Sequence, residues 1–438
     1  MSDMPIMSSG ECLSVLERWN SWGSAHFGPS QPRRVLKDIE LFLESPEVVA
    51  LIGPRRAGKT TLFHQLMSKL GEPAEACLHV NFEEPGLAPY IRVGLLDRLY
   101  EVYRERVYPV GRAFLFLDEI QVIPEWERWV RARNERNDVK IFVTGSSSAL
   151  MSRELGTLLT GRHVTFKVMP LDFAEFLRFR NIELPARPEL VSSVPQIAHA
   201  LENYLKWGGF PEVVLAEHDR RRQLLLEQYF SDILFKDVAL RYQVRDLQQL
   251  RLLAVHLMTQ TATLVSLRRL SQMLEASLDL VRSYCGYLQE AFLVDFLPYY
   301  SLKMGERIRR PQKVYSIDTG LRNAVCLSGS PDRGRLAETV AYGALSQEEG
   351  DLFYWKGVTE VDFLVRKGHR VDRLVQVAYQ GLDDPKVLQR EVRALTEAGE
   401  AFPEATRQLV VDTRGLSNTV PEGYQVVPLW RWSSQAPL

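Results

Sequence analysis

An α/β fold with a parallel sheet is predicted for the first half of this 438-residue chain. Short apolar runs, each long enough for one buried strand, alternate there with longer segments whose apolar residues recur at helical spacing. Continuously apolar strands are typical of parallel sheets, because helices cover both faces of such sheets. The expected strands occupy residues 48–52, 78–82, 114–117, 140–144 and 163–168, with helices such as 61–70 and 95–107 between them.

Breaks in this pattern divide the chain into four expected parts. A helical segment of mixed polarity comes first, and the sheet domain follows it. The third part is mostly helical, and strand-like runs alternate with helices again in the fourth, an α/β part. Prolines gather between the second and third parts, at Pro185, Pro188 and Pro195, which is typical of a boundary. The expected bounds are 1–45, 46–184, 197–312 and 313–438.

Composition and charge narrow the classes of function. Apolar residues make up 45% and charged residues 25% of the chain, which is ordinary for a globular protein. The net charge is −1, so no overall basic field favours nucleic acid or membrane. We expect no signal peptide and no membrane-spanning helix, because no apolar run approaches the necessary length. The four cysteines are far apart and lack metal-binding spacing, so we expect reduced thiols and a cytoplasmic location.

A phosphate-binding loop is the strongest motif. Residues 53–60 read GPRRAGKT and match GxxxxGK[ST] at each fixed position, between an apolar strand and a helix. This context disfavours a chance match. Glycines let backbone N–H groups point at phosphate oxygens, and the helix N-terminus adds partial positive charge. Lys59 is expected to reach the β- and γ-phosphates of ATP, and Thr60 to ligate Mg²⁺. The expected ATP-binding residues of the loop are Gly53, Pro54, Arg55, Arg56, Ala57, Gly58, Lys59, Thr60 and Thr61.

A pair of carboxylates completes the expected nucleotide site. The apolar run 114–117 ends in Asp118 and Glu119. Acids at the carboxyl end of a parallel strand lie where ligands bind in such sheets. We expect Asp118 to bind the nucleotide's Mg²⁺ through water, and Glu119 to orient and deprotonate the attacking water, with Lys59 as its catalytic partner. Taken alone, the two acids could instead cap a helix. With the loop, they predict Mg²⁺-dependent ATP hydrolysis.

Two further residues are candidates for catalysis. Ser146 follows the expected strand 140–144, where its side chain could contact the γ-phosphate or the attacking water. Capping of the next helix is the alternative for Ser146. Arg162 precedes the last expected strand and is a candidate arginine finger that projects toward the nucleotide of a neighbouring subunit. A surface arginine at the start of a strand is the alternative for Arg162.

Several motifs together carry a family resemblance. They are the loop GPRRAGKTTL, the strand FLFLDEIQ with Pro124 and Trp126 after it, the strand VTGSSS and the segment GRHVTFKVMPLDFAEFL, joined in the second half by YLKWGGFP and VYSIDTGL. The chain thereby resembles the prokaryotic AAA-type ATPases of the archaeal-ATPase-like group. The resemblance implies an AAA+ domain in a ring-forming or partner-dependent ATPase, and we expect a homo-oligomeric ring, such as a hexamer. It also implies a winged-helix middle domain and a C-terminal restriction-endonuclease-like domain.

The expected middle domain contains a candidate surface for DNA. Segments 265–274 and 277–288 have helical spacing and a tight connection, and a strand-like run with basic residues follows, as in a helix-turn-helix with a wing. The second helix offers only Arg282 for reading bases, and Asp279 opposes phosphate. We therefore expect contacts to DNA phosphates, with a solvated hairpin as the alternative. The expected contact residues are Arg307, Arg309, Arg310 and Lys313.

The expected C-terminal domain lacks part of a nuclease site. Such a site needs an acid on a helix, an acid on one strand and a Glu-x-Lys pair on the next. Glu338 lies in an expected helix, and Glu360 and Asp362 share one face of a strand. The expected Glu and Lys positions hold Gln376 and Ala378, which supply neither an anionic ligand nor a cation. We therefore expect no nuclease activity, and relic or ion-pairing roles for the remaining acids.

Two classes of function remain open at this point. In the first, ATP hydrolysis in a ring drives DNA remodelling or branch migration. In the second, the bound nucleotide controls a regulatory or signalling switch that binds a protein partner and does not move along DNA. The near-neutral net charge favours the second class. Stimulation of ATP hydrolysis by DNA distinguishes the two.

Overall fold

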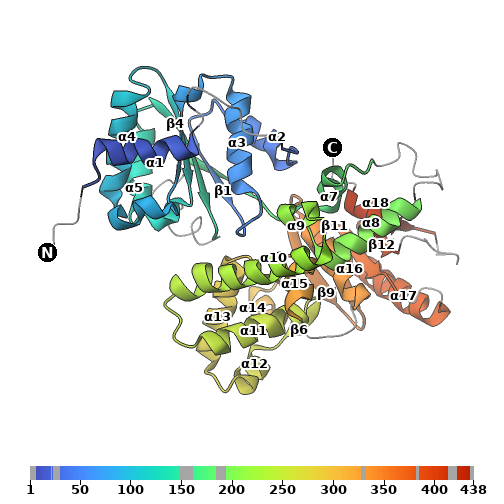
Figure 1. Ribbon diagram of the computed structural model, residues 1–438. Coiled ribbons are helices and arrows are strands. Elements are labelled where there is room, and N and C mark those ends of the chain that lie inside the picture. Colours follow the sequence, from blue (N-terminus) through green and yellow to red (C-terminus); the bar gives the residue numbers. More distant parts are fainter. Residues whose placement is uncertain are drawn as a thin grey trace. The chain divides into compact units, whose positions relative to one another are not determined.

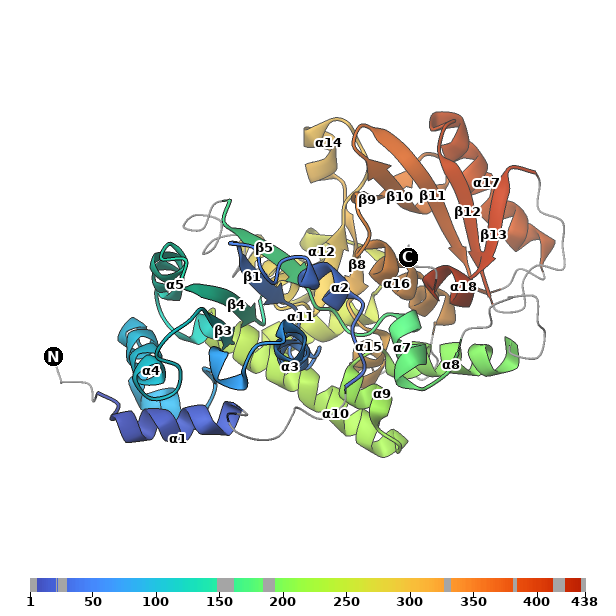
Figure 2. The same ribbon diagram turned by 90° about the horizontal axis from the view of Figure 1, so that it is seen from above.

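The chain forms two compact units, Met1–Met169 and Pro170–Leu438. The computed structural model describes residues 6–20, 22, 30–147, 161–183, 194–326, 332–380, 384–412 and 422–434 (Figures 1 and 2). Helix α7 (Phe173–Phe179), which we expected within the sheet domain, belongs to the second unit. The reason is that Phe173 and Phe176 are buried in one core with Leu201 and Leu205. In the described part of the chain, no helix is long and apolar enough to cross a membrane.

A five-stranded sheet with strand order β2-β3-β4-β1-β5 forms the centre of the first unit. All its neighbouring strands are parallel. Strands β1, β3 and β4 are buried along their whole length, as expected for strands covered on both faces. The strands are β1 (Val48–Ile52), β2 (Cys77–Asn81), β3 (Ala113–Asp118), β4 (Val139–Gly145) and β5 (His163–Lys167). The predicted parallel α/β sheet is confirmed.

Helices cover both faces of this sheet (Figure 1). On one face, α1 (Ser9–Trp19), α4 (Val93–Arg106) and α5 (Trp126–Asn134) share a core with alternate residues of the strands. On the other face, α2 (Val35–Glu40) and α3 (Lys59–Leu70) share a second core with the intervening residues. Short 3₁₀ turns lie at η1 (Ala74–Ala76), η2 (Pro85–Tyr90) and η3 (Ile120–Val122). Because α3 follows β1 directly, the loop between them lies at the carboxyl edge of the sheet.

The second unit begins with a helical region, as predicted. Two of its helices, α12 (Leu267–Met273) and α13 (Leu278–Glu290), confirm the two helical segments expected there. A small antiparallel sheet of strand order β6-β8-β7 packs with them. The other elements are α8 (Val194–Trp207), α9 (Pro211–Leu215), α10 (Asp219–Asp232), its π-helical continuation η5 (Ile233–Leu240), α11 (Leu247–Thr259), β6 (Thr263–Val265), β7 (Val294–Leu297), α14 (Met304–Arg309), β8 (Gln312–Ser316) and α15 (Thr319–Val325).

A mixed five-stranded sheet of order β13-β12-β11-β10-β9 follows. Strands β9, β10 and β11 are antiparallel, whereas β11, β12 and β13 are parallel. Helices α16 and α18 cover one face and α17 covers the other. The elements are α16 (Arg333–Leu345), β9 (Asp351–Lys356), β10 (Glu360–Lys367), β11 (Arg370–Ala378), α17 (Pro385–Ala401), β12 (Thr406–Val411), β13 (Tyr424–Pro428) and α18 (Leu429–Ser434).

Buried polar contacts join the helical region to the mixed-sheet region. The hydroxyls of Thr261 and Thr339 lie 2.8 Å apart, and the Tyr342 hydroxyl donates to Asp295 Oδ2 at 2.6 Å. Residue 313, where we expected the last part to begin, lies inside β8, which pairs with both β6 and β7. The two regions therefore form one compact unit.

The motifs YLKWGGFP and VYSIDTGL of the second half pack against each other at a buried contact between α8 and α15. The Asp318 carboxylate accepts hydrogen bonds from the backbone N–H groups of Gly209 and Leu321, both at 2.7 Å. Burial raises the pKa of Asp318 to about 6. At Gly208 the φ angle is +72°, and a Cβ there would lie 2.1 Å from Asp318 Oδ1, so a side chain does not fit. These motif residues therefore have a structural role, which is to pack α8 against α15.

Candidate nucleotide site

The loop between β1 and α3 has the backbone of a phosphate cradle. Arg56 and Gly58 have φ angles of 66° and 98°. Left-handed residues of this kind form the concavities in which backbone N–H groups bind anions. A Cβ at Gly53 would lie 2.0 Å from the carbonyl oxygen of Val168, so the close approach of the two chain segments requires glycine. The glycines that define the motif are thus needed by the local geometry.

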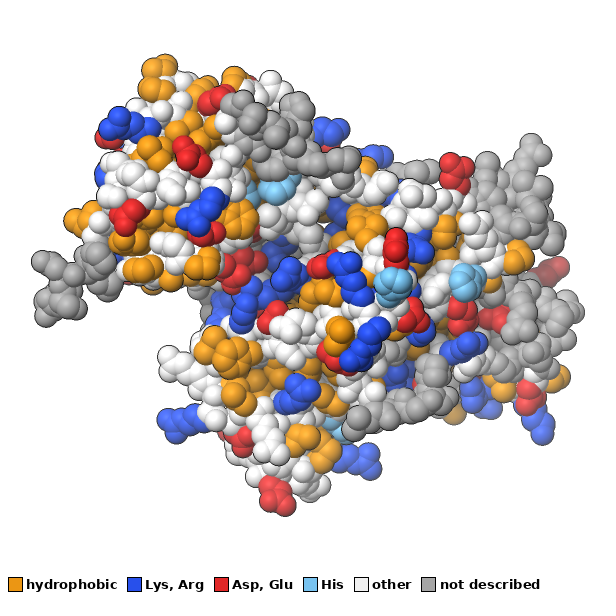
Figure 3. Space-filling model, viewed as in Figure 1, with side chains coloured by type: hydrophobic (Ala, Val, Ile, Leu, Met, Phe, Trp, Pro, Cys, Tyr) orange, Lys and Arg blue, Asp and Glu red, His pale blue; other side chains and the backbone are white. Residues whose placement is uncertain are grey.

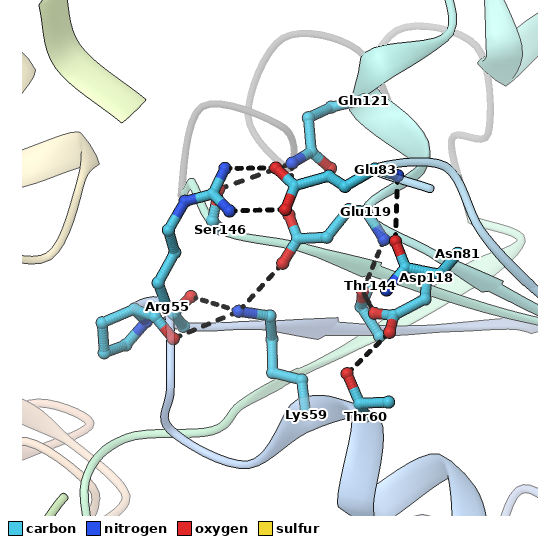
Figure 4. Close-up of polar contacts among 12 residues, drawn as sticks. Arg55, Lys59, Thr60, Asn81, Glu83, Asp118, Glu119, Gln121, Thr144 and Ser146 are labelled. Carbon is cyan, nitrogen blue, oxygen red and sulfur yellow. Dashed lines mark hydrogen bonds and ion pairs between the residues drawn. The ribbon is translucent and has the colours of Figure 1, made fainter. Parts of the chain in front are cut away.

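Lys59 lies at the centre of the site, with its side chain almost fully buried. Its Nζ donates to the carbonyl oxygens of Gly53 at 2.9 Å and Pro54 at 3.1 Å (Figure 4). Glu119 Oε1 is 3.4 Å from the same Nζ. The predicted phosphate-binding ammonium group and the predicted catalytic carboxylate are therefore neighbours. A phosphate group held by the loop would accept hydrogen bonds from this ammonium group.

Asp118 and Thr60 provide the oxygen atoms that suit Mg²⁺. The Thr60 hydroxyl donates to Asp118 Oδ2 at 2.6 Å, and the Thr144 hydroxyl donates to Oδ1. Burial opposes ionisation of Asp118, but nearby His79 and these hydroxyls outweigh it and lower the pKa of Asp118 below its ordinary value. An ionised carboxylate beside a hydroxyl is a donor set that Mg²⁺ prefers. The residues present therefore fit the predicted metal.

Glu119 is held in position from several sides. Its φ angle is 53°, an uncommon backbone conformation for a residue with a side chain, and one that is often found at functional sites. Its backbone N–H donates to the Thr144 hydroxyl at 2.9 Å. The Gln121 side chain donates to Glu119 Oε2, and the same nitrogen is 3.4 Å from the Ser146 hydroxyl. Gln121 thus connects the buried Ser146 to Glu119, a role that we did not predict.

Other predicted loop residues divide into inward and outward positions. Ala57 is fully buried in the core beneath α3, so its side chain cannot contact a ligand. Arg56 and Thr61 are exposed. Arg55 forms a two-bond ion pair with Glu83, in the loop after β2. Sequence reasoning missed Glu83, although its place one residue after the expected strand 78–82 was a usable signal.

Arg162 lies away from the loop of its own chain. Its guanidinium donates to Glu135 Oε1 at 2.7 Å, and 55% of its side chain is exposed. Val48 pairs with His163 and Ile52 with Lys167, so Arg162 is at the amino end of β5, about 13 Å of strand from the loop. Arg162 therefore does not serve its own site, and its action on a neighbouring subunit stays a prediction. The helix that Ser146 could have capped falls outside the described residues.

The expected contact between DNA and Lys313 is wrong. Only 3% of the Lys313 side chain is exposed. Its Nζ lies 3.0 Å from a carboxylate oxygen of each of Glu338, Glu360 and Asp362. The cause is the position of β8, which directs this side chain toward α16 and β10 instead of solvent. Lys313 is the cation that all three acids share, and Lys356 at the end of β9 also pairs with Glu360, at 3.5 Å.

The other three expected DNA contacts remain at the surface. Arg307 and Arg310 place their guanidinium groups over the rings of Phe353, at 4.6 Å, and Tyr299, at 4.9 Å. Arg309 is exposed and bonds only locally, to the Gly305 carbonyl oxygen at 3.0 Å. Stacking on an aromatic ring leaves the edge of a guanidinium available to other acceptors. These three residues stay predictions.

The position expected for the nuclease glutamate is occupied by hydrogen-bonded Gln376. Its Oε1 accepts from the backbone N–H of Asp362 at 3.2 Å, and its Nε2 donates to Glu391 at 2.7 Å. Asp362 Oδ2 also accepts from Val377 N at 3.0 Å. Across the described ranges, no group of three or more His, Cys, Asp or Glu residues could hold a metal ion.

The fold and the site define an AAA-type P-loop ATPase domain. A family model described as "AAA domain" matches residues 45–177, and one described as a domain of unknown function matches residues 198–332. The chain is 30% identical over 421 residues to "Uncharacterized protein MJ1544" of Methanocaldococcus jannaschii, with 91% of this chain and 90% of that protein covered. The chain therefore belongs to the family of the MJ1544 protein, and the predicted AAA-type ATPase domain is confirmed.

Similarity extends to a second relative and to solved structures. An uncharacterized protein of Haemophilus influenzae is 30% identical over 359 residues, which cover 79% of this chain and 86% of that protein. The Walker-type ATPase paby2304 of Pyrococcus abyssi has 14% identity and a TM-score of 0.45, with 67% of this chain and 95% of that chain covered. The Aeropyrum pernix ORC1 protein in complex with DNA has 15% identity and a TM-score of 0.32, with 68% and 93% covered. At these scores, neither structure bears on the function of this chain.

Proposed function

We propose that this protein hydrolyses ATP with Mg²⁺ at the carboxyl edge of the first sheet. One observation carries the proposal: Lys59 and Thr60, at the start of α3, meet Asp118 and Glu119, at the end of β3, through short contacts between the two segments. Mg²⁺ held by Thr60 and Asp118 would neutralise charge on the phosphate oxygens. Lys59 binds the terminal phosphates. Because Glu119 is 3.4 Å from Lys59, a water molecule on Glu119 is next to the phosphate that it attacks.

The finer proposal is that hydrolysis in a homo-oligomeric ring drives remodelling of DNA. The order α11–β6–α12–α13–β7–β8, with α14 in the connection from β7 to β8 and with sheet order β6-β8-β7, resembles that of a winged helix-turn-helix, and this supports DNA binding. Arg282 of α13 already pairs with Asp279 at 2.7 Å, so we do not propose base reading by that helix. Arg307, Arg309 and Arg310 stay in the proposal as phosphate contacts, and the exposed Arg268, Arg269 and Lys303 join them. Arg162 would complete a neighbour's nucleotide site in the ring.

A specific observation favours the second candidate, a nucleotide-controlled switch that binds a protein. Leu302, Met304 and Ile308, in and beside α14, have exposed fractions of 85%, 65% and 76%. Grouped apolar side chains at the surface are typical of protein–protein contacts. Basic and acidic side chains are interspersed on the face shown in Figure 3, which is unlike a dedicated DNA-binding field. The segment in and beside α14 thus offers cations for DNA phosphates under the motor proposal and apolar side chains for a protein partner under the switch proposal.

DNA is expected to stimulate ATP turnover if the motor proposal holds. Phosphate release is measured with single-stranded, duplex and four-way DNA at several salt concentrations. Phosphate contacts are screened by salt, so stimulation should fall steeply between about 50 and 200 mM salt. The variant Arg268→Ala/Arg269→Ala should lose stimulation and keep its basal turnover, whereas Ile308→Ser should keep both. Turnover that ignores all three DNAs would reject the motor and leave the switch.

We further propose that the C-terminal domain does not cleave nucleic acid. The Lys313 ammonium group touches all three acids of the cluster, and Gln376 is engaged by Asp362 and Glu391, which supports a structural role for these side chains. Incubation of the purified protein with plasmid or branched DNA and Mg²⁺ or Mn²⁺ should therefore leave the DNA intact. Metal-dependent cleavage that disappears in Asp362→Ala would overturn this proposal.

A further inference from the structure

A two-bond ion pair spans from the phosphate loop to the loop after β2. Arg55 Nη1 and Nη2 donate to the two carboxylate oxygens of Glu83 at 2.7 and 2.6 Å. Glu83 is itself anchored, because its backbone N–H donates to the Asn81 side-chain oxygen at 2.9 Å. Two parallel bonds between a guanidinium and a carboxylate fix direction as well as distance. The Arg55 guanidinium therefore has one defined orientation.

The position of this pair relates it to the nucleotide site. Figure 4 shows the Arg55 side chain rising from the loop beside Lys59, with its guanidinium facing Glu83 above the Glu119 carboxylate. In the proposed hydrolysis, the terminal phosphate and the attacking water would meet beside Lys59 and Glu119, which lie 3.4 Å apart. A guanidinium oriented at the border of that place can donate hydrogen bonds to phosphate oxygens without a large movement.

An ordinary surface ion pair is the competing explanation. Such pairs contribute about 0–1 kcal/mol to stability and need no further role. Arg112 and Glu44 form one, at 2.9 Å, with 37% and 74% of their side chains exposed. Only 14% of the Arg55 side chain is exposed, and its bonds are paired. Arg112 precedes β3, at the opposite end of the strand from Asp118, which makes it a matched control.

We propose that Arg55 is a catalytic residue that acts within its own chain and that Glu83 is the positioning residue that orients it. This inference rests on the proposed ATP hydrolysis. In that reaction a bond forms between the water oxygen and the γ-phosphorus, the bond from the γ-phosphorus to the bridging oxygen breaks, and Glu119 takes the water proton. Arg55 donates hydrogen bonds to the transferred phosphoryl group and stabilises its negative charge. No group is oxidised or reduced.

Turnover measurements test the two roles separately. Arg55→Ala should lower kcat about a hundredfold, the loss typical of one oriented donor to a transition state. Arg55→Lys should recover only part of it, because lysine keeps the charge but not the paired bonds. Glu83→Gln should lower kcat about tenfold by misplacing Arg55. Arg55→Ala/Glu83→Gln should be no slower than Arg55→Ala, because Glu83 acts through Arg55.

Several outcomes would overturn the proposal. The first is a kcat of Arg55→Ala within twofold of wild type. The second is a double variant whose loss of kcat equals the product of the two single losses. The third is a Glu83→Gln enzyme with a higher kcat than wild type. Arg112→Ala controls for loss of an ion pair and should keep wild-type kcat. Mixing Arg55→Ala with Lys59→Ala protein should not restore turnover. Restoration would mean that Arg55 serves a neighbouring subunit, as proposed for Arg162, and would refute action within one chain.

Nucleotide binding separates failure of this inference from failure of the proposed ATPase. In a Glu119→Gln background, the dissociation constants of ATP and ADP are measured with and without Arg55→Ala. Only ATP carries the γ-phosphate, so the preference for ATP over ADP should fall about tenfold when Arg55 is removed. If wild-type protein does not hydrolyse ATP, the ATPase proposal fails. The ratio of the dissociation constants of ADP and ATP, with and without Arg55→Ala, then decides whether Arg55 contacts the γ-phosphate. An unchanged ratio would then reject the inference.

Discussion

Replacing Glu119 with glutamine is expected to lower ATP turnover about a thousandfold and to leave ATP binding in place. Glutamine has nearly the same shape and keeps one oxygen as an acceptor for either Lys59 or Gln121, which contact Oε1 and Oε2 of Glu119, but it cannot take a proton from water. The buried contacts of Asp118 with Thr60 and Thr144 are untouched. Steady-state phosphate release measures the loss, and titration with ATP measures the retained affinity. Chelation of Mg²⁺ should also stop wild-type turnover.

The Lys59→Ala variant should lose both binding and turnover. In the wild-type chain, the Lys59 ammonium group is the buried cation that contacts the loop carbonyls and Glu119. Alanine removes this group, and with it the proposed hydrogen-bond donor to the phosphates. Arg112→Ala, at the other end of β3, provides the control for a lost surface cation and should behave as wild type. Unchanged turnover in Lys59→Ala would refute the site assignment, whatever Glu119→Gln shows.

Replacing Lys313 with methionine is expected to destabilise the second unit by about 3–5 kcal/mol at neutral pH. Methionine fills much of the same volume but leaves Glu338, Glu360 and Asp362 without their shared cation. Burial alone would lower the pKa of Lys313, yet these carboxylates outweigh it and hold that pKa well above its ordinary value. The lysine is therefore charged at every pH at which the fold is studied. Denaturant unfolding of the full chain measures the loss.

The cost of removing Lys313 should grow with pH. Burial, and then the neighbouring Asp362, raise the pKa of Glu338 to about 7 from an ordinary value of 4.5. The folded state thus binds a proton that the unfolded state has released, so the Glu338 contribution to stability falls as pH rises from 4.5 to about 7. Without the Lys313 ammonium, which favours the ionised form, Glu338 should stay protonated to higher pH. Lys313→Met should therefore lose more stability at pH 8 than at pH 5.

Two comparisons test this explanation. Lys303→Met removes an exposed lysine nearby and should change stability by less than about 0.5 kcal/mol. Adding Glu338→Gln to Lys313→Met should recover part of the loss, because one buried negative charge is removed. A loss below about 1 kcal/mol in Lys313→Met, independent of pH, would show that the cluster does not depend on this cation.

The nucleotide site was predictable because its parts are local in sequence. The loop 53–60 follows its strand and opens its helix within one continuous segment, and Asp118 and Glu119 end an apolar run. Parallel strands place all such ends at one edge, so the sheet brings them together without further information. Gln121 and Glu83 follow strand ends as well, and the same rule applied to every polar residue there would have included them.

The burial of Lys313 could not be predicted from the sequence. In the sequence it completes a basic run from Lys303, and such a run usually faces solvent. It is buried because β8 pairs with β6 and β7 and packs against α16 and β10, and its partner Asp362 is 49 residues away along the chain.

The sequence by itself determined the parallel sheet and the phosphate loop, and it predicted the residues that we propose to hold metal and water, because each depends on neighbours along the chain. Only the tertiary structure decided which charges are paired: Lys313 with three acids, Arg162 with Glu135 and Arg55 with Glu83. The physical reason is that an ion pair depends on distances between segments, and these are set by long-range packing that no local pattern encodes.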